Sequence, residues 1–444
     1  MKQIKKVVTR FAPSPTGMMH IGGVRTALYE FLVARKNSGT FMLRIEDTDR
    51  TRFVQGATED IIDSLKWLGL NFDEGPVIQS ERKEFYAEYA KELVDKGAAY
   101  ESEGAIWFKV PKVGQVKFTD LVGNREVSFD LEKQKDFVLL KSDGFPTYHL
   151  AHVVDDHLFS TNPVIRAEEW MSSAPKHILT FQAFGWEVPR YAHLPLILGT
   201  DRSKLSKRHG AKGVSEFRKD GFLPEAILNY MVFLGWTPPS GKEFLSLEEM
   251  IEEFDLKDVH ISPAVFDITK LEWMNGEYIR KTENSKLKDQ IYQYLQDLSE
   301  GALTKKDHPT EEDIEKAIPL IKERIKKLSD FIPLTDFLWE EPEYDMKEFQ
   351  KLKIKNQNQV KKLLNNIMGI LEEMKRPWEA KNFEQTFRKL AEDEGLPAGE
   401  VFQLIRIAVS GQSVTPPLFE SIEILGEEET LKRVEFIVSN YSKF

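Results

Sequence analysis

The chain has 444 residues, of which 41% are hydrophobic and 30% charged, and its net charge is −11. This composition predicts folded cores in about three domains, and the absence of cysteine excludes disulfides and Cys-ligated metal sites. No apolar run reaches the roughly 18 residues of a membrane helix, and the basic N-terminal residues lack the apolar core of a signal peptide, so a cytoplasmic protein without a membrane partner is expected. The negative charge argues only weakly against nucleic acid, because binding depends on where basic groups cluster.

The first predicted elements are a short buried strand at residues 7–8, a turn rich in proline and glycine, and a helix. Prolines and glycines within residues 13–23 end the strand and allow a sharp turn. Apolar residues then recur at helical spacing over residues 24–34, and Gly39 closes the helix. Because free N–H groups and the helix dipole favour an anion here, the turn is a candidate phosphate site with His20 at its mouth. It matches neither G-x-x-x-x-G-K-[ST] nor G-x-G-x-x-G, and alone it is also typical of an ordinary helix start.

The next part of the chain alternates strand and helix patterns, which predicts a parallel sheet. Between about residues 98 and 141 the pattern changes to short strands, which indicates a small insertion in the sheet domain. The expected strands lie at residues 41–45, 105–110, 115–118, 136–140, 148–154, 164–167 and 194–198. The expected helices lie at residues 54–68 and 81–96 and, in the mostly helical chain after Gly213, at 222–235, 311–331, 359–374, 383–394, 401–409 and 428–440.

A second candidate motif lies far downstream, at Lys204-Leu-Ser-Lys207-Arg208. Its cations bracket a serine in a glycine-flanked segment, which suits a mobile loop that closes over phosphates. Taken alone, such a segment is more often a solvated basic loop. Its occurrence together with the turn near His20 favours a nucleotide site.

Several motifs together resemble the glutamyl branch of the class I aminoacyl-tRNA synthetases. Residues 13–23 resemble the HIGH signature of that family, with Gly23 where many class I relatives carry a second histidine, and residues 204–208 resemble its KMSKS loop. Further matches follow in the same order at residues 44–50, 148–151, 164–170, 404–411 and 416–419, so the resemblance covers nearly the whole chain. It implies an α/β fold: a Rossmann-like parallel-sheet catalytic domain with a small α+β insertion, followed by an all-α C-terminal region.

The resemblance also implies how the chain is divided. The expected segments are the first half of the catalytic domain (1–97), an inserted tRNA acceptor-binding domain (98–147), the second half of the catalytic domain (148–213), a helical connecting domain (214–285) and an all-helical anticodon-binding domain (286–444). The insertion looks short for the family. Without cysteine it cannot hold the zinc that some relatives bind.

The activity implied by the resemblance is the ligation of L-glutamate to tRNA. The glutamate α-carboxylate attacks the α-phosphorus of ATP, pyrophosphate leaves, and the acyl group passes to the terminal adenosine of the tRNA. Such a reaction depends mainly on positioning and on stabilisation of charge. By resemblance the catalytic residues are His20, Lys204 and Lys207, and ATP is bound by these three with Gly22, Gly23 and Glu169. A monomer is expected, and Mg²⁺ carried with ATP is the only metal expected.

The resemblance places glutamate at Arg10, Ala12 (through its backbone), Ser14, Glu46, Tyr148 and Arg166. Guanidinium groups can hold a carboxylate in bidentate geometry, whereas a glutamine amide would leave buried cations without a counter-charge. Glu46 would face the substrate ammonium. In the alternative interpretation, Arg10 and Arg166 only form ion pairs with acids, namely Glu46, Asp47 or Glu168.

Three other features are weaker. The run from His149 through His152, Asp155 and Asp156 to His157 has spacing that could fit a metal site, but these side chains need not converge if the run is a strand. The acidic residues 46–49 could also be read as a magnesium site. In the helical tail, lysine-rich stretches are typical of a solvated face, and Arg406 is the candidate contact to tRNA near the anticodon.

Two other functional classes stay open. One is a related enzyme, either a glutaminyl-tRNA synthetase or a nucleotidyltransferase that shares the His-x-Gly turn. The usual glutaminyl enzymes end in β-barrels, which the helical tail opposes, and a nucleotidyltransferase would not need such a tail. The other class is a catalytically silent tRNA-binding relative, which should have lost His20 or the lysines. Whether the enzyme charges only tRNA for glutamate or also tRNA for glutamine stays open as well.

Overall fold

The computed structural model describes residues 6–299, 309–354, 356–374 and 377–441. The chain forms two compact units. We call them the sheet unit, which contains Met1–Arg218 and Phe222–Met274, and the helical unit, which contains Lys219–Gly221 and Asn275–Phe444. The boundary between them falls inside helix α9 (Ile268–Lys281).

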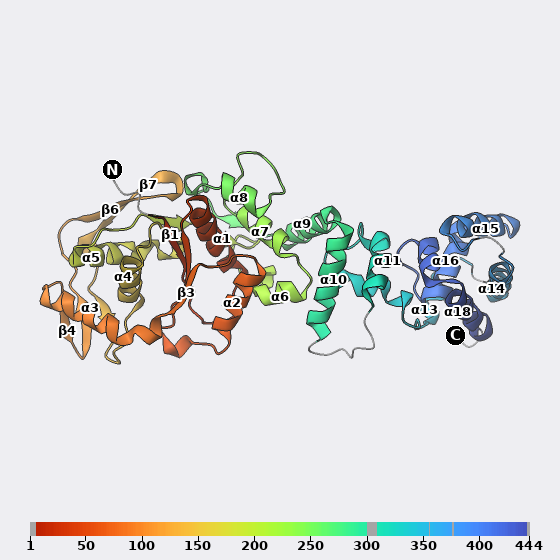
Figure 1. Cartoon of the computed structure of the whole chain (residues 1–444), viewed down its shortest axis with the longest axis horizontal. Helices are drawn as coiled ribbons and strands as arrows, with labels where there is room; N and C mark the ends of the chain where they lie inside the picture. The colour runs from red at the N-terminus through yellow and green to blue at the C-terminus, as the bar shows by residue number, and fades with distance from the viewer. Residues whose placement is uncertain (1–5, 300–308, 355, 375–376, 442–444) are drawn as a thin grey trace. The chain divides into compact units, whose positions relative to one another are not determined.

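Parallel strands form the centre of the sheet unit (Figure 1). One set has the order β1-β2-β3 and the other β7-β6-β10-β9, and every neighbouring pair is parallel except the hairpin β6–β7. The two sets meet at β1 and β9, where Val8 bridges Asn162 and Arg10 donates to the Ile165 carbonyl. The strands are β1 (Val8–Phe11), β2 (Thr40–Ile45), β3 (Glu74–Ile78), β6 (Gln115–Asp120), β7 (Arg125–Asp130), β9 (Val164–Ala167) and β10 (Tyr191–Leu194). This arrangement confirms the predicted Rossmann-like parallel sheet.

Helix α1 (Ile21–Lys36) is buried on most of its surface. It packs on β1, β2 and β9 and also against α7 (Pro224–Val232) and α8 (Leu247–Glu253). The hydroxyl of Tyr29 donates to the Val232 carbonyl at 3.0 Å, and Arg25 donates to the Leu234 carbonyl at 2.9 Å. The helix ends before Gly39, at the C-cap Asn37, and the Gly39 N–H bonds the Ala34 carbonyl at 2.7 Å.

The segment expected as an insertion contributes to two different sheets. Strands β4 (Ala99–Ser102), β5 (Ala105–Phe108) and β8 (Phe137–Leu140) form an antiparallel sheet of their own. The hairpin β6–β7 instead joins the main sheet, where Asp120 pairs with Tyr191. The five predicted segments and the four boundaries between them stay predictions.

Two sequence expectations are wrong, and a third differs in part, because the strand predicted at residues 194–198 is interrupted: β10 ends at Leu194 and β11 covers Ile197–Leu198. The strand predicted at residues 148–154 is helix α4 (Tyr148–Leu158), whose apolar run is buried against neighbouring helices and so reads like a buried strand. The helix predicted at residues 311–331 ends at Ile321 as α11 (Glu311–Ile321), and the chain continues through a short 3₁₀ turn to α12 (Phe331–Thr335). It turns there because the Leu328 N–H bonds the Gly221 carbonyl.

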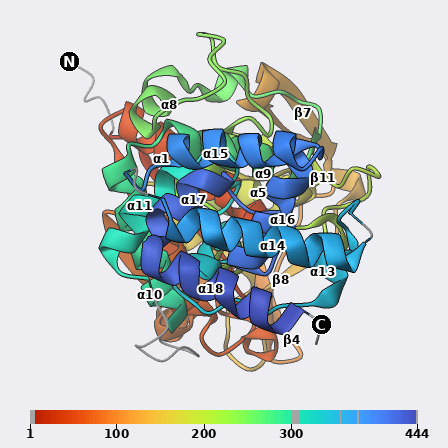
Figure 2. The same ribbon diagram turned by 90° about the vertical axis from the view of Figure 1, so that its right-hand side faces the viewer.

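The remaining helices of the sheet unit are α2 (Ala57–Trp67), α3 (Lys83–Asp95), α5 (Ala174–Phe184) and α6 (Val214–Lys219). In the helical unit, α14 (Gln357–Glu372), α15 (Ala380–Asp393), α16 (Ala398–Ser410), α17 (Leu418–Leu425) and α18 (Glu427–Asn440), which are labelled in Figure 2, share one apolar core. The further helices of this unit are α10 (Asn284–Ser299) and α13 (Met346–Gln350). None of the helices in the described ranges has both the length and the hydropathy that crossing a bilayer requires.

Candidate active site

The turn between β1 and α1 ends on His20, the N-cap residue of α1. Its Nδ1 accepts a hydrogen bond from the Gly22 N–H at 3.0 Å. A Cβ at position 22 would lie 3.2 Å from that nitrogen, so glycine gives the imidazole room over the first helical turn. No residue of the first turn of α1 is acidic, although Asp60 Oδ2 accepts from the Met19 N–H at 2.6 Å just before the helix. The partial positive charge of the helix end favours an anion there.

We call the segment Gly199–Ala211, which contains Lys204 and Lys207, the lysine loop. The residues that follow it lie directly against the turn that ends on His20. The Ile21 N–H donates to the Lys212 carbonyl at 3.2 Å, and the Val214 N–H donates to the Met19 carbonyl at 2.9 Å, so His20 and Gly213 form a bridge. At its other end the loop is held by strand β11 (Ile197–Leu198), which pairs with β12 (Ala264–Val265). The structure therefore brings the two motifs together, although they are far apart in the sequence.

The lysine loop itself is folded around His209. A Cβ at Gly199 would lie 2.5 Å from His209 Cγ, and the Ser206 N–H donates to His209 Nδ1 at 3.1 Å. From this loop Lys204 reaches Glu169 just beyond β9, with Nζ 2.5 Å from Oε1, and both side chains are exposed. The side chain of Lys207 lies outside what the structure describes.

Arg166, on β9, is 4% exposed. Its Nε donates to His193 Nε2 at 3.0 Å, and its Nη1 lies 2.9 Å from His177 Nδ1 and 3.5 Å from the Tyr148 hydroxyl. Its Nη2 is buried and has no hydrogen-bond partner among the described residues. No carboxylate of the described residues forms an ion pair with Arg166, so its charge is available to an anion from outside.

Arg10, on β1, is in a different position because its own chain already neutralises it. Its Nε donates to Asp156 Oδ1 at 3.1 Å, and its Nη1 donates to Glu30 Oε1 at 3.3 Å. The same Asp156 oxygen accepts from Arg44 Nη1 at 2.6 Å. The alternative interpretation paired Arg10 and Arg166 with Glu46, Asp47 or Glu168. These three acids pair instead with Arg44, Arg50 and Arg125, respectively.

Glu46 directly follows β2, and its N–H bonds the Pro13 carbonyl at 2.9 Å, which ties this strand end to the turn after β1. Its Oε1 accepts from Arg44 Nη2 at 2.8 Å. Burial raises the pKa of Glu46, against the opposing charges of Arg44 and Arg10. A cationic group placed beside this carboxyl would favour its ionised form.

The other predicted glutamate contacts lie at the same edge of the sheet. Ala12 and Ser14 are in the turn after β1, with Ser14 exposed. Tyr148 starts α4; its ring lies 5.1 Å from that of His152 and 4.2 Å from that of Trp170. Ligands in open parallel sheets bind beyond the carboxyl ends of the strands, where the strand order reverses, and the junction of β1 and β9 is such a place.

Several residues of this site were not predicted. They are Arg44, Asp120, Asp156, His177 and His193. A helical reading of residues 148–158 would have found one of them, because residues at i and i+4 share a helix face and so place Asp156 with His152 and Tyr148. Asp120 and His193 come from separate strands, and no local signal in the sequence joins them to Arg166.

The two patterns whose spacing could have fitted a metal ion are engaged within the chain. His149 Nδ1 lies 3.0 Å from His177 Nε2, and His152 pairs with Asp156. In the acidic cluster, Asp47 accepts from the Ser80 N–H and Asp49 from the Thr51 N–H. Among the described residues, no group of three or more His, Asp or Glu side chains is arranged to hold a metal ion.

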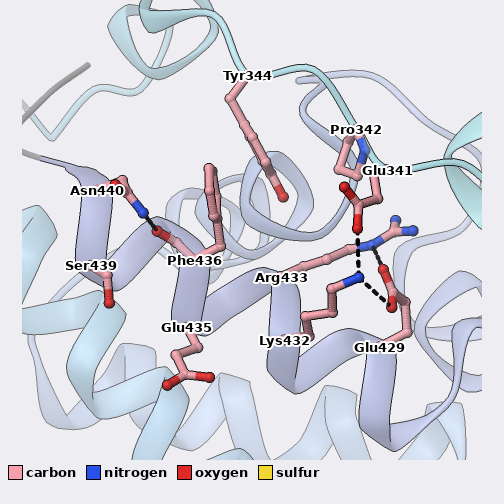
Figure 3. Close-up of a pocket in the computed structure, with 10 residues that line it drawn as sticks. All are labelled: Glu341, Pro342, Tyr344, Glu429, Lys432, Arg433, Glu435, Phe436, Ser439 and Asn440. Carbon is pink, nitrogen blue, oxygen red and sulfur yellow. Dashed lines mark hydrogen bonds and ion pairs between the residues drawn. The ribbon is translucent and has the colours of Figure 1, made fainter.

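The helical unit has a surface pocket with a volume of about 370 Å³. Its lining residues, which include Tyr344 and Phe436, are drawn in Figure 3. Its cations are neutralised by neighbouring acids: Lys432 lies 2.6 Å from Glu341, and Arg433 Nε lies 2.8 Å from Glu429. This pocket therefore offers no free positive charge to a nucleic acid.

Arg406, the predicted tRNA contact, lies on α16 and holds the following loop. Its Nη1 donates to the carbonyls of Thr415 and Pro416 at 3.1 and 2.9 Å. Arg324 Nη1 approaches the same Thr415 carbonyl at 3.4 Å. Of the lysine-rich stretches, Lys351 and Lys362 pair with acids of their own chain, and residues 355, 375 and 376 lie outside the described ranges.

Comparison with known families gives two matches that together span most of the chain. Residues 6–105 and 101–273 match a model described as "tRNA synthetases class I (E and Q), catalytic domain". Residues 286–438 match a model described as "Anticodon binding domain". The first match contains the turn at His20, the lysine loop and Arg166.

Individual relatives are similar over almost their full length. Curated proteins named glutamate–tRNA ligase include one from Dehalococcoides mccartyi, 40% identical over 99% of this chain and 98% of the relative, and one from Borrelia recurrentis, 39% identical over 97% and 95%. A crystal structure of a glutamate tRNA ligase from Elizabethkingia meningosepticum, in complex with its amino acid, superposes with a TM-score of 0.85 at 31% identity and covers 98% of this chain and 99% of that one.

Proposed function

This chain belongs to the class I tRNA synthetases of the E and Q type, and we propose that it ligates L-glutamate to tRNA, using ATP to form glutamyl-adenylate first. One observation of the site carries the choice of amino acid. Arg166 is buried, keeps its charge without a carboxylate partner and leaves Nη2 unbonded. A glutamate side-chain carboxylate would complete it, whereas a glutamine amide would leave a buried cation uncompensated.

The other proposed contacts surround that carboxylate. Tyr148 lies at the edge of the Arg166 guanidinium, and Glu46, at the end of β2, would face the substrate ammonium. Arg10 is already paired with Asp156 and Glu30, so it orders the pocket and adds less uncompensated charge than Arg166. Ala12 and Ser14 would complete the pocket from the turn after β1.

The phosphate end would be formed by His20, Gly22 and Gly23 at the start of α1 with Lys204 and Lys207, and Glu169 would complete the set of ATP-binding residues. In the structure Lys204 is paired with Glu169. When ATP binds, the ammonium would exchange this exposed carboxylate for a phosphate, which costs little because surface pairs contribute about 0–1 kcal/mol. The lysines would then neutralise the charge that moves onto the leaving pyrophosphate.

Lys207→Ala tests the lysine loop. We expect the rate of adenylate formation to fall about 100- to 1000-fold, the size expected for loss of a charge-stabilising group, while the KM for glutamate changes little. Glutamate-dependent exchange of pyrophosphate into ATP measures both quantities. Exchange near the wild-type rate would remove Lys207 from the catalytic set.

Mg²⁺ would enter with the phosphates of ATP and supply further positive charge there. The helical unit would bind the anticodon part of the tRNA, with Arg406 near it. A cytoplasmic location, a monomeric state and the absence of a membrane partner stay predictions.

Aminoacylation of purified tRNAs for glutamate and for glutamine with labelled glutamate would show which of them the enzyme charges. Exchange supported by glutamine in place of glutamate would contradict the proposed amino acid.

A further inference from the structure

The groups that hold the guanidinium of Arg166 are electrically neutral acceptors. His193 Nε2 receives the Nε proton on one side, and His177 Nδ1 lies 2.9 Å from Nη1 on the other. Burial lowers the pKa of both imidazoles, which keeps them uncharged at neutral pH. A carboxylate in either place would hold the arginine equally well, but it would also cancel the charge that the substrate needs.

The hydrogen-bond pattern fixes where each proton must be. Because an arginine N–H can only donate, His193 Nε2 must be unprotonated and its proton must lie on Nδ1. Asp120 Oδ2 lies 2.5 Å from that Nδ1 and accepts this proton's hydrogen bond. The other carboxylate oxygen of Asp120 accepts the N–H groups of Val122 at 3.0 Å and His193 at 3.2 Å, which fixes the rotation of the carboxylate.

We propose that Asp120 and His193 are positioning residues for amino-acid recognition: Asp120 holds His193 in the Nδ1–H tautomer, so that Nε2 orients Arg166 with its unbonded Nη2 toward the substrate carboxylate. This inference rests on the proposed function of Arg166. The β6–β7 hairpin comes from the segment predicted to bind the tRNA acceptor end. Because Asp120 is the last residue of β6, the inference also gives this hairpin a role in the amino-acid pocket.

Asp120→Asn is the sharpest test, since the two backbone N–H bonds hold the amide oxygen in the place of Oδ1. The amide nitrogen then faces His193 Nδ1 and donates to it, which moves the imidazole proton to Nε2. Two donors, His193 Nε2–H and Arg166 Nε–H, would then face each other. We expect the KM for glutamate to rise about 10- to 100-fold, as for a misplaced binding group, with the KM for ATP and the melting temperature close to wild type.

His193→Gln separates orientation from general damage. The glutamine carbonyl can accept from Arg166 Nε without any tautomer, so this variant should bind glutamate nearly as the wild type does. Adding Asp120→Asn to it should then have no further effect on the KM for glutamate. His193→Leu removes the acceptor and should raise that KM as Asp120→Asn does. Asp130→Asn, at the exposed end of the same hairpin, is the matched control and should change nothing.

The measurements are glutamate- and ATP-dependent pyrophosphate exchange and ¹⁵N NMR of labelled histidines, which reports the tautomer of His193. Support consists of a raised KM for glutamate alone in Asp120→Asn, a shift of the proton to Nε2, and rescue by His193→Gln. An unchanged KM for glutamate, or an equal rise for ATP, overturns the inference. If Asp120→Asn does not fold, the comparison of His193→Gln with His193→Leu decides in the same way. Wild-type protein without glutamate-dependent exchange would refute the proposed function instead.

Discussion

Arg166 in the sheet unit and Arg433 in the helical unit are equally buried, each 4% exposed, but their surroundings differ. Arg433 donates to Glu429 and to the carbonyls of Phe337, Val409 and Glu340, so a carboxylate and three peptide oxygens complete it. Arg166 is held by imidazole nitrogens and a phenol and keeps one nitrogen unbonded. A buried cation that the chain itself completes stabilises the fold, whereas one left incomplete is available to a ligand.

A third arginine shows that the absence of a carboxylate is not sufficient. Arg25, on α1, is 3% exposed, and its Nη groups donate to the carbonyls of Leu234 and Pro195. Burial lowers its pKa. Both of its Nη groups therefore bind backbone oxygens and fasten α1 to the segments that it contacts. Arg25 also has a buried nitrogen without a partner, its Nε, so what distinguishes Arg166 among the described arginines is that its unpartnered buried nitrogen is a terminal one, Nη2.

The largest effect is expected on the stability of the helical unit, from replacing Arg433, whose side chain is bound by a carboxylate and three carbonyls of its own chain. Arg433→Met leaves three carbonyls and Glu429 without their donor, and we expect the helical unit to lose about 3–5 kcal/mol of its free energy of unfolding. Hydrogen exchange of α16 and α18 amides measures this loss. Because the proposed glutamate site lies in the sheet unit, the KM for glutamate should not change. A raised KM would contradict the separation of the two roles.

Arg166→Gln removes the charge of the arginine that keeps one nitrogen unbonded. A neutral amide cannot supply the charge, so the KM for glutamate should rise about 100-fold, equivalent to about 3 kcal/mol of binding. Pyrophosphate exchange measures it, with the KM for ATP as the internal control. The melting temperature should change less than in Arg433→Met. An unchanged KM for glutamate would remove Arg166 from the recognition site.

A pH series sharpens the difference between the two units. Burial, together with the charges of Lys176 and Arg166, lowers the pKa of His149 to about 4, from about 6.5 in an unfolded chain. Between these values the unfolded state binds a proton that the folded state does not, so stability must fall as the pH falls. From pH 6.5 to 5 the loss is about 2 kcal/mol for this group.

The helical unit should not share this dependence, because its only histidine is His308, which lies outside the described residues. Urea unfolding followed separately in the two units at pH 7, 6 and 5 is the measurement. His149→Gln should reduce the slope for the sheet unit without abolishing it, because burial also lowers the pKa of His152, His177 and His193. An identical slope in both units would show that buried histidines are not its cause.

The smallest effect is expected next to Arg433. Lys432→Ala removes an exposed ammonium from Glu341 and Glu429, and surface pairs of this kind contribute about 0–1 kcal/mol. The stability of the helical unit should therefore change by less than about 0.5 kcal/mol. A loss as large as that of Arg433→Met would mean that charge, and not burial, decides what these residues contribute.

Much of the fold is readable from local patterns. Glycine and apolar spacing located α1, and the apolar run that became β2 was found within one residue of its observed start at Thr40. Helix α4 was misread because Leu150–Val154 is a continuous buried run with two β-branched valines, and period alone does not separate such a helix from a strand.

The candidate site was readable only where motifs run continuously in the sequence. His20, Lys204 and Arg166 belong to such motifs. The network behind Arg166 does not, because Asp120, His193 and Arg166 meet only after β6, β10 and β9 have paired, and their register is a property of the assembled sheet. The pairing of Lys212–Val214 with Met19–Ile21 could not be read from the sequence for the same reason.

That pairing has a consequence for Lys204 and Lys207, the proposed catalytic lysines. The segment from Gly199 to Ala211 is anchored at one end by β11 and at the other by the bridge at His20, so the number of residues between the anchors limits how far Lys204 and Lys207 can travel. Each doubling of a flexible loop costs only about 0.6 kcal/mol. A few residues inserted there would leave the fold intact and, under the proposed function, would displace the two ammonium groups from the triphosphate of ATP. The length of this loop would then set how closely the lysines approach the reacting phosphates.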